Sequence, residues 1–145
     1  MSGCALGFDY GTRRIGVASG NRITTSAQPL QPLSAQAGEP DWRRVDTLLA
    51  EWKPEALIVG LPLMLDGSDQ TITRRARAFA DALLERYKLP VHLIDERHTS
   101  QQAARDFAAQ RAAGIKRRRD AANLDSQAAA IIMYCWLGEE PKVDS

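Results

Sequence analysis

The sequence is poor in cysteine and histidine, and both shortages exclude a class of protein. Its two cysteines, Cys4 and Cys135, lie far apart within apolar stretches, which excludes a disulfide framework and predicts two buried thiols. The two histidines, His92 and His98, do not stand in the Cys/His spacing that is typical of zinc sites. With 44% hydrophobic residues, the chain is expected to be stabilised by one ordinary apolar core.

The sequence also lacks long apolar runs. No run approaches the roughly 20 residues that a membrane span requires. The first residues carry neither the basic flank nor the cleavage site of a signal peptide, so we predict a cytoplasmic protein without membrane association. The length and the absence of repeats or linkers predict a single domain over residues 1–138, followed by a flexible tail over 139–145.

A strong net charge is missing too, but the charge is unevenly distributed. The formal net charge of +1 divides into −1 over residues 1–96, +6 over 97–119 and −4 over 120–145. A concentrated basic segment creates a local field that attracts phosphate. We therefore expect nucleic-acid phosphates to be held by Arg97, Arg111, Lys116, Arg117, Arg118 and Arg119, although a run of this kind is also compatible with a solvated surface loop. Arg14, outside this segment, is a further expected substrate-binding residue.

Hydrophobic periodicity predicts a mixed α/β domain. An apolar stripe at helical spacing begins near Trp42, and Pro54 prevents its continuation, while Gly20-Asn21 is a tight-turn signal between two strands. The expected strands are 4–9, 14–19, 22–33, 56–59 and 91–94, and the expected helices are 42–52, 71–87, 99–111 and 120–137. This order fits a five-stranded mixed sheet, with a three-strand antiparallel meander and two parallel strands flanked by helices, as in the RNase H-like fold.

Three acidic residues are placed where such a fold brings ligands together. Asp9 follows an apolar strand and precedes Gly11, so its carboxylate should emerge at a strand end, although an Asp beside Gly also serves in turns. Asp95 and Glu96 follow the buried 91–94 strand and point in opposite directions if that strand continues, so only one should face the site. Asp125 lies on the apolar side of the last helix, where an unpaired charge is costly.

Carboxylates from a first strand, a later strand and a last helix match the needs of phosphodiester hydrolysis. Oxygen ligands suit Mg²⁺ or Mn²⁺, and two such ions can activate water and stabilise the leaving oxygen. We therefore predict that Asp9, Glu96 and Asp125 are the catalytic residues and the metal ligands.

Four motifs give the chain a family resemblance: GFDYGTRRIGVA (7–18), IVGLP (58–62), DERHTS (95–100) and LDSQAAA (124–130). Together they resemble the YqgF family, also called RuvX-like Holliday-junction resolvases, over almost the whole chain. The resemblance implies an RNase H-like nuclease, and a role in maturing the 5′ end of pre-16S ribosomal RNA. It implies that Asp9, Glu96 and Asp125 bind metal, that Gly11, Arg14 and Gly16 shape the first hairpin, and that Arg97 and the 116–119 loop contact substrate.

Three alternatives stay open. Four-way DNA is a second substrate class, because no residue pattern reads a 2′-hydroxyl or a junction, and structured RNA is favoured by the resemblance alone. A DxGT hairpin also occurs in ATP-binding phosphotransferases, but those close two lobes around the nucleotide and this chain supplies one. A non-catalytic nucleic-acid or ribosome-assembly module would keep the basic loop without turnover. Association with ribosomal precursor particles would suit RNA processing, and the oligomeric state is not readable from the sequence.

Overall fold

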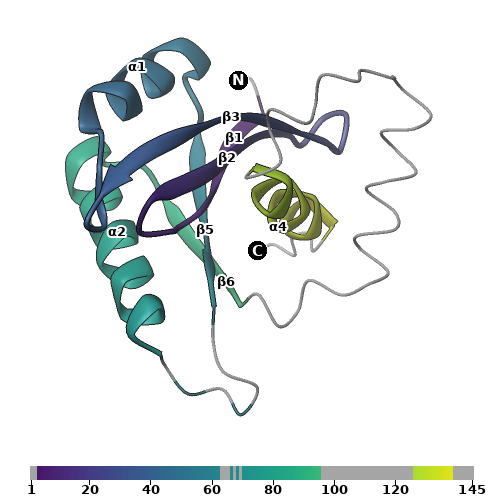
Figure 1. Cartoon of the computed structure of the whole chain (residues 1–145). Helices are drawn as coiled ribbons and strands as arrows, with labels where there is room; N and C mark the ends of the chain where they lie inside the picture. Colours follow the sequence, from purple (N-terminus) through teal and green to yellow (C-terminus); the bar gives the residue numbers. More distant parts are fainter. Residues whose placement is uncertain (1–2, 63–65, 67, 69, 96–125, 139–145) are drawn as a thin grey trace.

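A computed structural model describes residues 3–62, 66, 68, 70–95 and 126–138 of the chain. These residues form a mixed sheet with helices on both faces (Figure 1). The strands are β1 (Cys4–Asp9), β2 (Arg14–Asn21), β3 (Ser26–Gln36), β4 (Glu39–Pro40), β5 (Ala56–Leu61) and β6 (Val91–Asp95), and the helices are α1 (Trp42–Trp52), α2 (Thr71–Tyr87) and α4 (Gln127–Gly138).

The sheet has the order β4-β3-β2-β1-β5-β6. The first four strands form an antiparallel meander, whereas β5 pairs parallel with β1 and β6 pairs parallel with β5. The mixed α/β architecture predicted from the sequence is therefore confirmed. The sheet has six strands rather than five, because the two-residue strand β4 folds back on β3 after a turn at Ala37-Gly38.

Helices α1 and α2 have the bounds that the sequence predicted, and both have identifiable ends. The Asp41 side chain caps α1 by accepting a hydrogen bond from the backbone N–H of Arg43 at 3.2 Å. Lys53, in the left-handed conformation, ends this helix just before Pro54. At the start of α2, Gln70 and Thr73 form a reciprocal capping box, and the predicted helix is thereby fixed at its first turn.

Two apolar cores, rather than the one that the composition predicted, lie on the two faces of the sheet, because helices cover both faces. Helices α1 and α2 cover one face, where Leu6, Phe8 and Phe79 are buried, and α4 covers the other, where Ile58 and Met133 are buried. We call these the α1/α2 face and the α4 face. Because side chains alternate along each strand, consecutive residues of β1 serve different cores, and this alternation decides which way the residues of the site point.

Two local predictions were wrong. Gly20 and Asn21 belong to β2, and the turn follows at residues 22–25, where the Asn21 side chain accepts the N–H groups of Ile23 and Thr24. Strand β6 was expected to be buried, but His92 and Leu93 are exposed, because β6 is the last strand of the sheet that the described residues form and within it pairs with β5 alone.

Both cysteines are thiols, as predicted. Cys4 is buried, and this burial, followed by the repulsion from Glu55, raises its thiol pKa. Cys135 is only half-buried, so the expectation of two buried thiols holds for Cys4 alone. Among the described residues, no helix is long and apolar enough to cross a membrane.

Candidate active site

Asp9 is the last residue of β1, and its side chain is half-buried. Asp9 pairs with Gly16 of β2 on one side of β1. On the other side of β1, its chain neighbour Phe8 pairs with Val59 of β5. Strands β1, β5 and β6 are parallel, so their carboxyl ends lie at one edge of the sheet. Asp9 therefore stands at the edge where open α/β sheets place their ligands, as its position in the sequence predicted.

Strand alternation gives the face toward which Asp9 points. Ala5 belongs to the core beneath α4, and a side chain at Gly7 would meet Met133 of α4 at 3.1 Å, whereas Leu6 and Phe8 belong to the other core. Asp9 has the same parity as residues 5 and 7. Its carboxylate is thus on the α4 face of the carboxyl edge.

Asp95 ends β6 at the same edge, opposite Leu61 of β5. Its parity is that of Val91, which packs against the α1/α2 core, while Ile94 belongs to the α4 core. The two acids at the described ends of β1 and β6 consequently face opposite sides of the sheet. The sequence predicted that only one of Asp95 and Glu96 would face the site, and Asp95 is on the face away from Asp9.

Helix α4 crosses the sheet antiparallel to β1 and begins at the Asp9 end. Next to its first residue, the buried Ser126 accepts a hydrogen bond from the backbone N–H of Val17 at 2.9 Å, and Val17 is the neighbour of Gly16 in β2. Farther along, Met133 lies against Gly20, which pairs with Ala5 near the opposite end of β1. A Cβ at Gly20 would overlap the Met133 side chain, so glycine at this position allows the close approach of α4.

The hydrogen bond to Ser126 falls where the ladder between β2 and β3 is irregular. Ile15 pairs with Leu33 and Val17 with Leu30, so the register shifts between them and β3 contains an extra residue. Sequence reasoning assigned no role to Ser126. The signal that could have identified it is its place in LDSQAAA, a hydroxyl directly before a run of small apolar residues that begins the last helix.

The hairpin between β1 and β2 brings Arg14 to the same end of the sheet. A Cβ at Gly11 would lie 2.5 Å from the carbonyl oxygen of Arg14, so the turn requires glycine there. Arg14 itself is exposed and begins β2, paired with Ser34 of β3. The hairpin role that the resemblance implied for Gly11 agrees with this geometry, whereas the role of the Arg14 side chain stays a prediction.

The other predicted site residues, Glu96, Arg97, Arg111, Lys116, Arg117, Arg118, Arg119 and Asp125, lie outside the described residues. The helices expected over 99–111 and over 120–125 lie outside them as well, and α4 is described from Gln127. Within the described ranges, no group of three or more His, Cys, Asp or Glu side chains could hold a metal ion. Asp9 is the one predicted metal ligand among the described residues, and its carboxylate is of the oxygen-donor type that suits Mg²⁺ or Mn²⁺.

Comparison with solved structures identifies the class of protein that this fold defines. T. thermophilus RuvC, in its structure "in complex with Holliday junction substrate", superposes with a TM-score of 0.58 at 18% identity over 89% of this chain and 91% of RuvC. The yeast mitochondrial Holliday junction resolvase Ydc2 superposes with a TM-score of 0.55 at 12% identity, over 92% of this chain and 78% of Ydc2. The fold is therefore the RNase H-like fold of the RuvC-type resolvases.

Comparison of sequences then gives the family. Residues 3–139 match the RuvX family, described as "Holliday junction resolvase", and the chain belongs to this family. A relative from Xanthomonas axonopodis pv. citri is 51% identical over 135 residues, which are 93% of this chain and 87% of the relative. A relative from Xanthomonas campestris pv. campestris is 52% identical over 132 residues, 91% of this chain and 85% of the relative. Both carry the name "Putative pre-16S rRNA nuclease".

Proposed function

We propose that this protein is a divalent-metal-dependent nuclease whose catalytic carboxylates are Asp9, Glu96 and Asp125. The observation that carries the proposal is the hydrogen bond between Val17 N–H and Ser126 Oγ. This bond holds Ser126, which follows Asp125 in the chain, next to Gly16, the pairing partner of Asp9 in β2. If side chains continued to alternate beyond β6, the side chain at position 96 would point to the α4 face, because Asp95 points to the α1/α2 face.

The chemistry follows from the residue types in this arrangement. Asp9, Glu96 and Asp125 would hold the metal through carboxylate oxygens, and Mg²⁺ or Mn²⁺ bound there supplies an activated water and charge neutralisation at the attacked phosphate. The protein's own contribution would be to hold three carboxylates at one edge of the sheet, with Asp9 at the end of β1, Glu96 next after β6 in the chain and Asp125 shortly before α4. Arg14, Arg97, Arg111 and the run Lys116 to Arg119 are proposed to bind substrate phosphates.

The proposed substrate is precursor 16S ribosomal RNA, cut during maturation of its 5′ end in the cytoplasm. The names of relatives about 50% identical over nearly the full chain support this choice. Structured RNA and ribosomal precursor particles would then be the partners. The proposed extent of the nuclease domain is residues 1–138, with 139–145 as a tail.

Four-way DNA is the second candidate substrate, because the family's description is that of a Holliday junction resolvase. Both substrates present dense phosphate, and phosphate contacts do not distinguish them. A side-by-side assay of the purified protein on precursor 16S RNA and on a four-way junction, with Mn²⁺ and with chelator, separates the two. We expect metal-dependent cleavage of the RNA.

Replacement of the three carboxylates tests the site. Asp9→Asn, Glu96→Gln and Asp125→Asn should each lower the cleavage rate by about 100-fold or more, because even outer-shell partners of metal ligands cost about 10–100-fold. Far-UV circular dichroism should show that the fold is retained. Asp95→Asn is the matched control: it removes a neighbouring acid from the same strand end but from the other face, and should cleave like the unmodified protein.

The same assay distinguishes a non-catalytic binding module and a phosphotransferase. Unchanged cleavage in all three carboxylate variants would rule out this site and indicate a contaminating nuclease. If Asp9→Asn left RNA processing intact in cells while replacement of residues 116–119 abolished it, the binding-module interpretation would replace ours. Measurable ATP affinity without nuclease activity would favour a phosphotransferase.

A further inference from the structure

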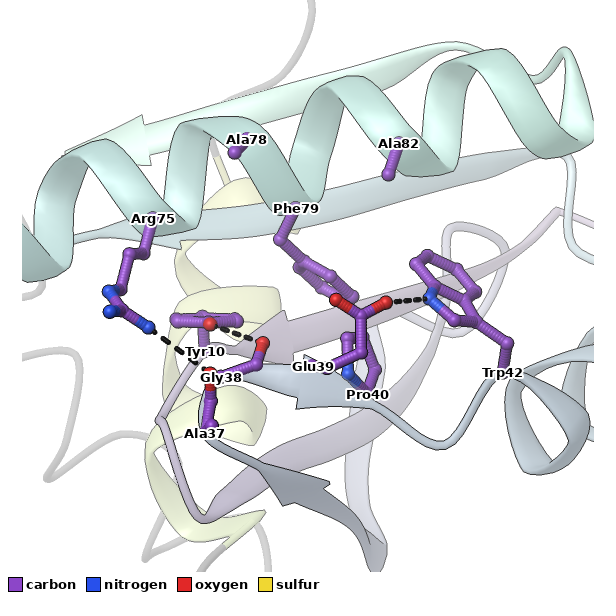
Figure 2. Close-up of a pocket in the computed structure, with 10 residues that line it drawn as sticks. All are labelled: Tyr10, Ala37, Gly38, Glu39, Pro40, Trp42, Arg75, Ala78, Phe79 and Ala82. Carbon is purple, nitrogen blue, oxygen red and sulfur yellow. Dashed lines mark hydrogen bonds between the residues drawn. The ribbon is translucent and has the colours of Figure 1, made fainter.

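A pocket of about 240 Å³ lies on the α1/α2 face, away from α4 (Figure 2). Its walls are aromatic, with Tyr10 from the residue after β1, Trp42 from the start of α1 and Phe79 from α2. Two charged side chains, Glu39 and Arg75, also line it. Ala78 and Ala82 complete the α2 side with small side chains, which leave room for a planar group between the helix and residues 37–40, the turn and β4.

Hydrogen bonds and ring contacts hold these walls in place. The Tyr10 hydroxyl donates to the carbonyl oxygen of Gly38 at 2.6 Å, and the Tyr10 and Phe79 ring centroids are 5.5 Å apart. The Trp42 Nε1–H donates to Glu39 Oε2 at 2.9 Å, which orients the carboxylate. The pocket is thus preformed in the part of the chain that the structure describes.

The two charges in the pocket are available to a ligand. Arg75 makes one long contact, from Nη1 to the carbonyl oxygen of Ala37 at 3.4 Å, and a guanidinium carries five N–H donors. Glu39 uses one oxygen on Trp42 and can accept more hydrogen bonds through the other. No ion pair joins Arg75 to Glu39 in the part of the chain that the structure describes, so these two charges do not neutralise each other.

This combination defines the chemistry of the ligand. The Glu39 carboxylate opposes binding of a bare phosphate, and the aromatic walls favour a flat ring. The ring must offer donors to Glu39 and acceptors to Arg75. Among the nucleobases, guanine has two donors, N1–H and N2–H₂, on one side of O6, and two acceptors, O6 and N7, that match a guanidinium.

We propose that this pocket binds a guanine base, with Glu39 accepting from N1–H and N2–H₂ and Arg75 donating to O6 and N7. The proposal rests on the proposed function, because the base would belong to a substrate strand that crosses the carboxyl edge of the sheet. Tyr10 is the residue next to Asp9 in the chain. The first turn of α2 is fixed at the same edge, since Thr73 Oγ1 and Gln70 Nε2 both donate to the carbonyl oxygen of Pro62, directly after β5. A guanosine in the pocket would therefore select the phosphodiester bond that reaches Asp9.

Binding is tested with the full chain and two guanine sources, GMP and a short single-stranded RNA with one central guanosine. The intrinsic fluorescence of Trp42 should change saturably with either ligand, and Trp42→Phe should abolish the change. Replacing guanosine with inosine, which lacks N2–H₂, should weaken binding by roughly tenfold, since a bidentate base contact discriminates by about 1–3 kcal/mol. Glu39→Gln and Arg75→Gln should weaken guanosine binding by a similar factor. Arg74→Gln removes the neighbouring exposed arginine that does not line the pocket, and should bind normally.

The outcomes separate this proposal from that of the nuclease. Asp9→Asn should bind the guanosine RNA but not cut it, and Glu39→Gln should reduce the preference for cutting beside guanosine over inosine. If the unmodified protein bound guanine but cleaved no nucleic acid, the nuclease proposal would be wrong and the guanine-binding proposal would stand. Equal affinity for guanosine and inosine, competition by ribose 5-phosphate as strong as by GMP, or an effect of Arg74→Gln equal to that of Arg75→Gln would overturn the guanine site.

Discussion

The hydroxyl of Ser126 joins two segments that are 109 residues apart in the chain. Val17 N–H is buried, and without this acceptor it would be left unsatisfied beneath α4. Ser126→Ala should therefore lower the free energy of unfolding by about 1–3 kcal/mol, which is the usual cost of a buried donor without a partner. Because the bond also fixes the start of α4, the cleavage rate should fall as well. Urea denaturation and a cleavage assay under native conditions measure the two effects.

The matched control for this substitution is Ser34→Ala. Ser34 is an exposed residue of β3, and its hydroxyl should be removable with a change within about ±0.5 kcal/mol and no loss of cleavage. Full cleavage activity in Ser126→Ala, with the expected loss of stability, would mean that the helix start does not position the site. Unchanged stability would contradict the hydrogen bond itself.

At the scale of elements, a polar cluster on the surface joins α1 to α2. Asp46 accepts from Arg86 at 3.1 and 3.0 Å and from the Tyr87 hydroxyl at 2.6 Å, and the Arg86 guanidinium lies 4.9 Å above the Trp42 ring. Hydrogen bonds from Arg86 and then Tyr87 lower the pKa of Asp46, while burial and then the bond to Asp46 raise the pKa of Tyr87 to about 12.

The lowered pKa of Asp46 predicts how this cluster depends on pH. A carboxylate with a depressed folded-state pKa adds stability above its unfolded pKa of about 3.9, and this stability is lost as the pH falls through the folded value. Asp46→Asn should therefore be less stable than the unmodified protein near pH 7, by a small margin because the pair is exposed, and the difference should vanish in acid. Urea midpoints between pH 7 and pH 2.5 measure it. Asp81→Asn, an exposed acid of α2 outside the cluster, is the control, and an equal pH trend in both variants would contradict the prediction.

The elements that could be predicted from sequence are those set by local signals. Helices α1 and α2 could be predicted from helical spacing and, for α1, from the proline at 54, signals that act within a few residues. The turn after β2 was predicted too early in the chain, at Gly20-Asn21. Gly20 is a strand residue whose missing side chain allows contact with Met133 of α4, a neighbour distant in sequence. Asn21 ends the strand, and its side chain accepts a hydrogen bond from the turn that follows. Strand β4 was missed because a two-residue strand has no periodicity.

The candidate site divides in the same way. Asp9 and the edge on which it lies were predictable, since an apolar strand followed by Asp and Gly is a local pattern. Three other features depend on which face of the sheet packs against which helices. They are the direction in which Asp95 points, the hydrogen bond of Ser126 at the start of α4, and the pocket beside Tyr10. That information is a property of the packed sheet and has no signal in the spacing of residues.

For the molecule as a whole, the distribution of charge matters more than its sum. The chain has a formal net charge of +1, yet residues 97–119 carry +6. Affinity for nucleic acid should therefore fall steeply with salt although the whole protein is almost neutral, because each neutralised phosphate releases counterions. Removing two cations that contact phosphate should make the slope of log K against log salt less negative by about 1.4–1.8.

The test compares two pairs of cations. Arg118→Gln with Arg119→Gln removes two charges from the basic run, and Lys53→Asn with Lys88→Asn removes two from the ends of α1 and α2, beside the amino ends of β5 and β6 and away from Asp9. Asn suits these two positions because both lysines are in the left-handed conformation. Both double variants have the same net charge, so a whole-molecule effect would change both slopes equally. We expect the shallower slope for the arginine pair alone, measured by fluorescence anisotropy on a labelled RNA between 50 and 300 mM salt, roughly the range over which phosphate contacts lose most of their affinity. Equal slopes would mean that the basic run is a solvated loop and that the substrate follows another path to the carboxyl edge.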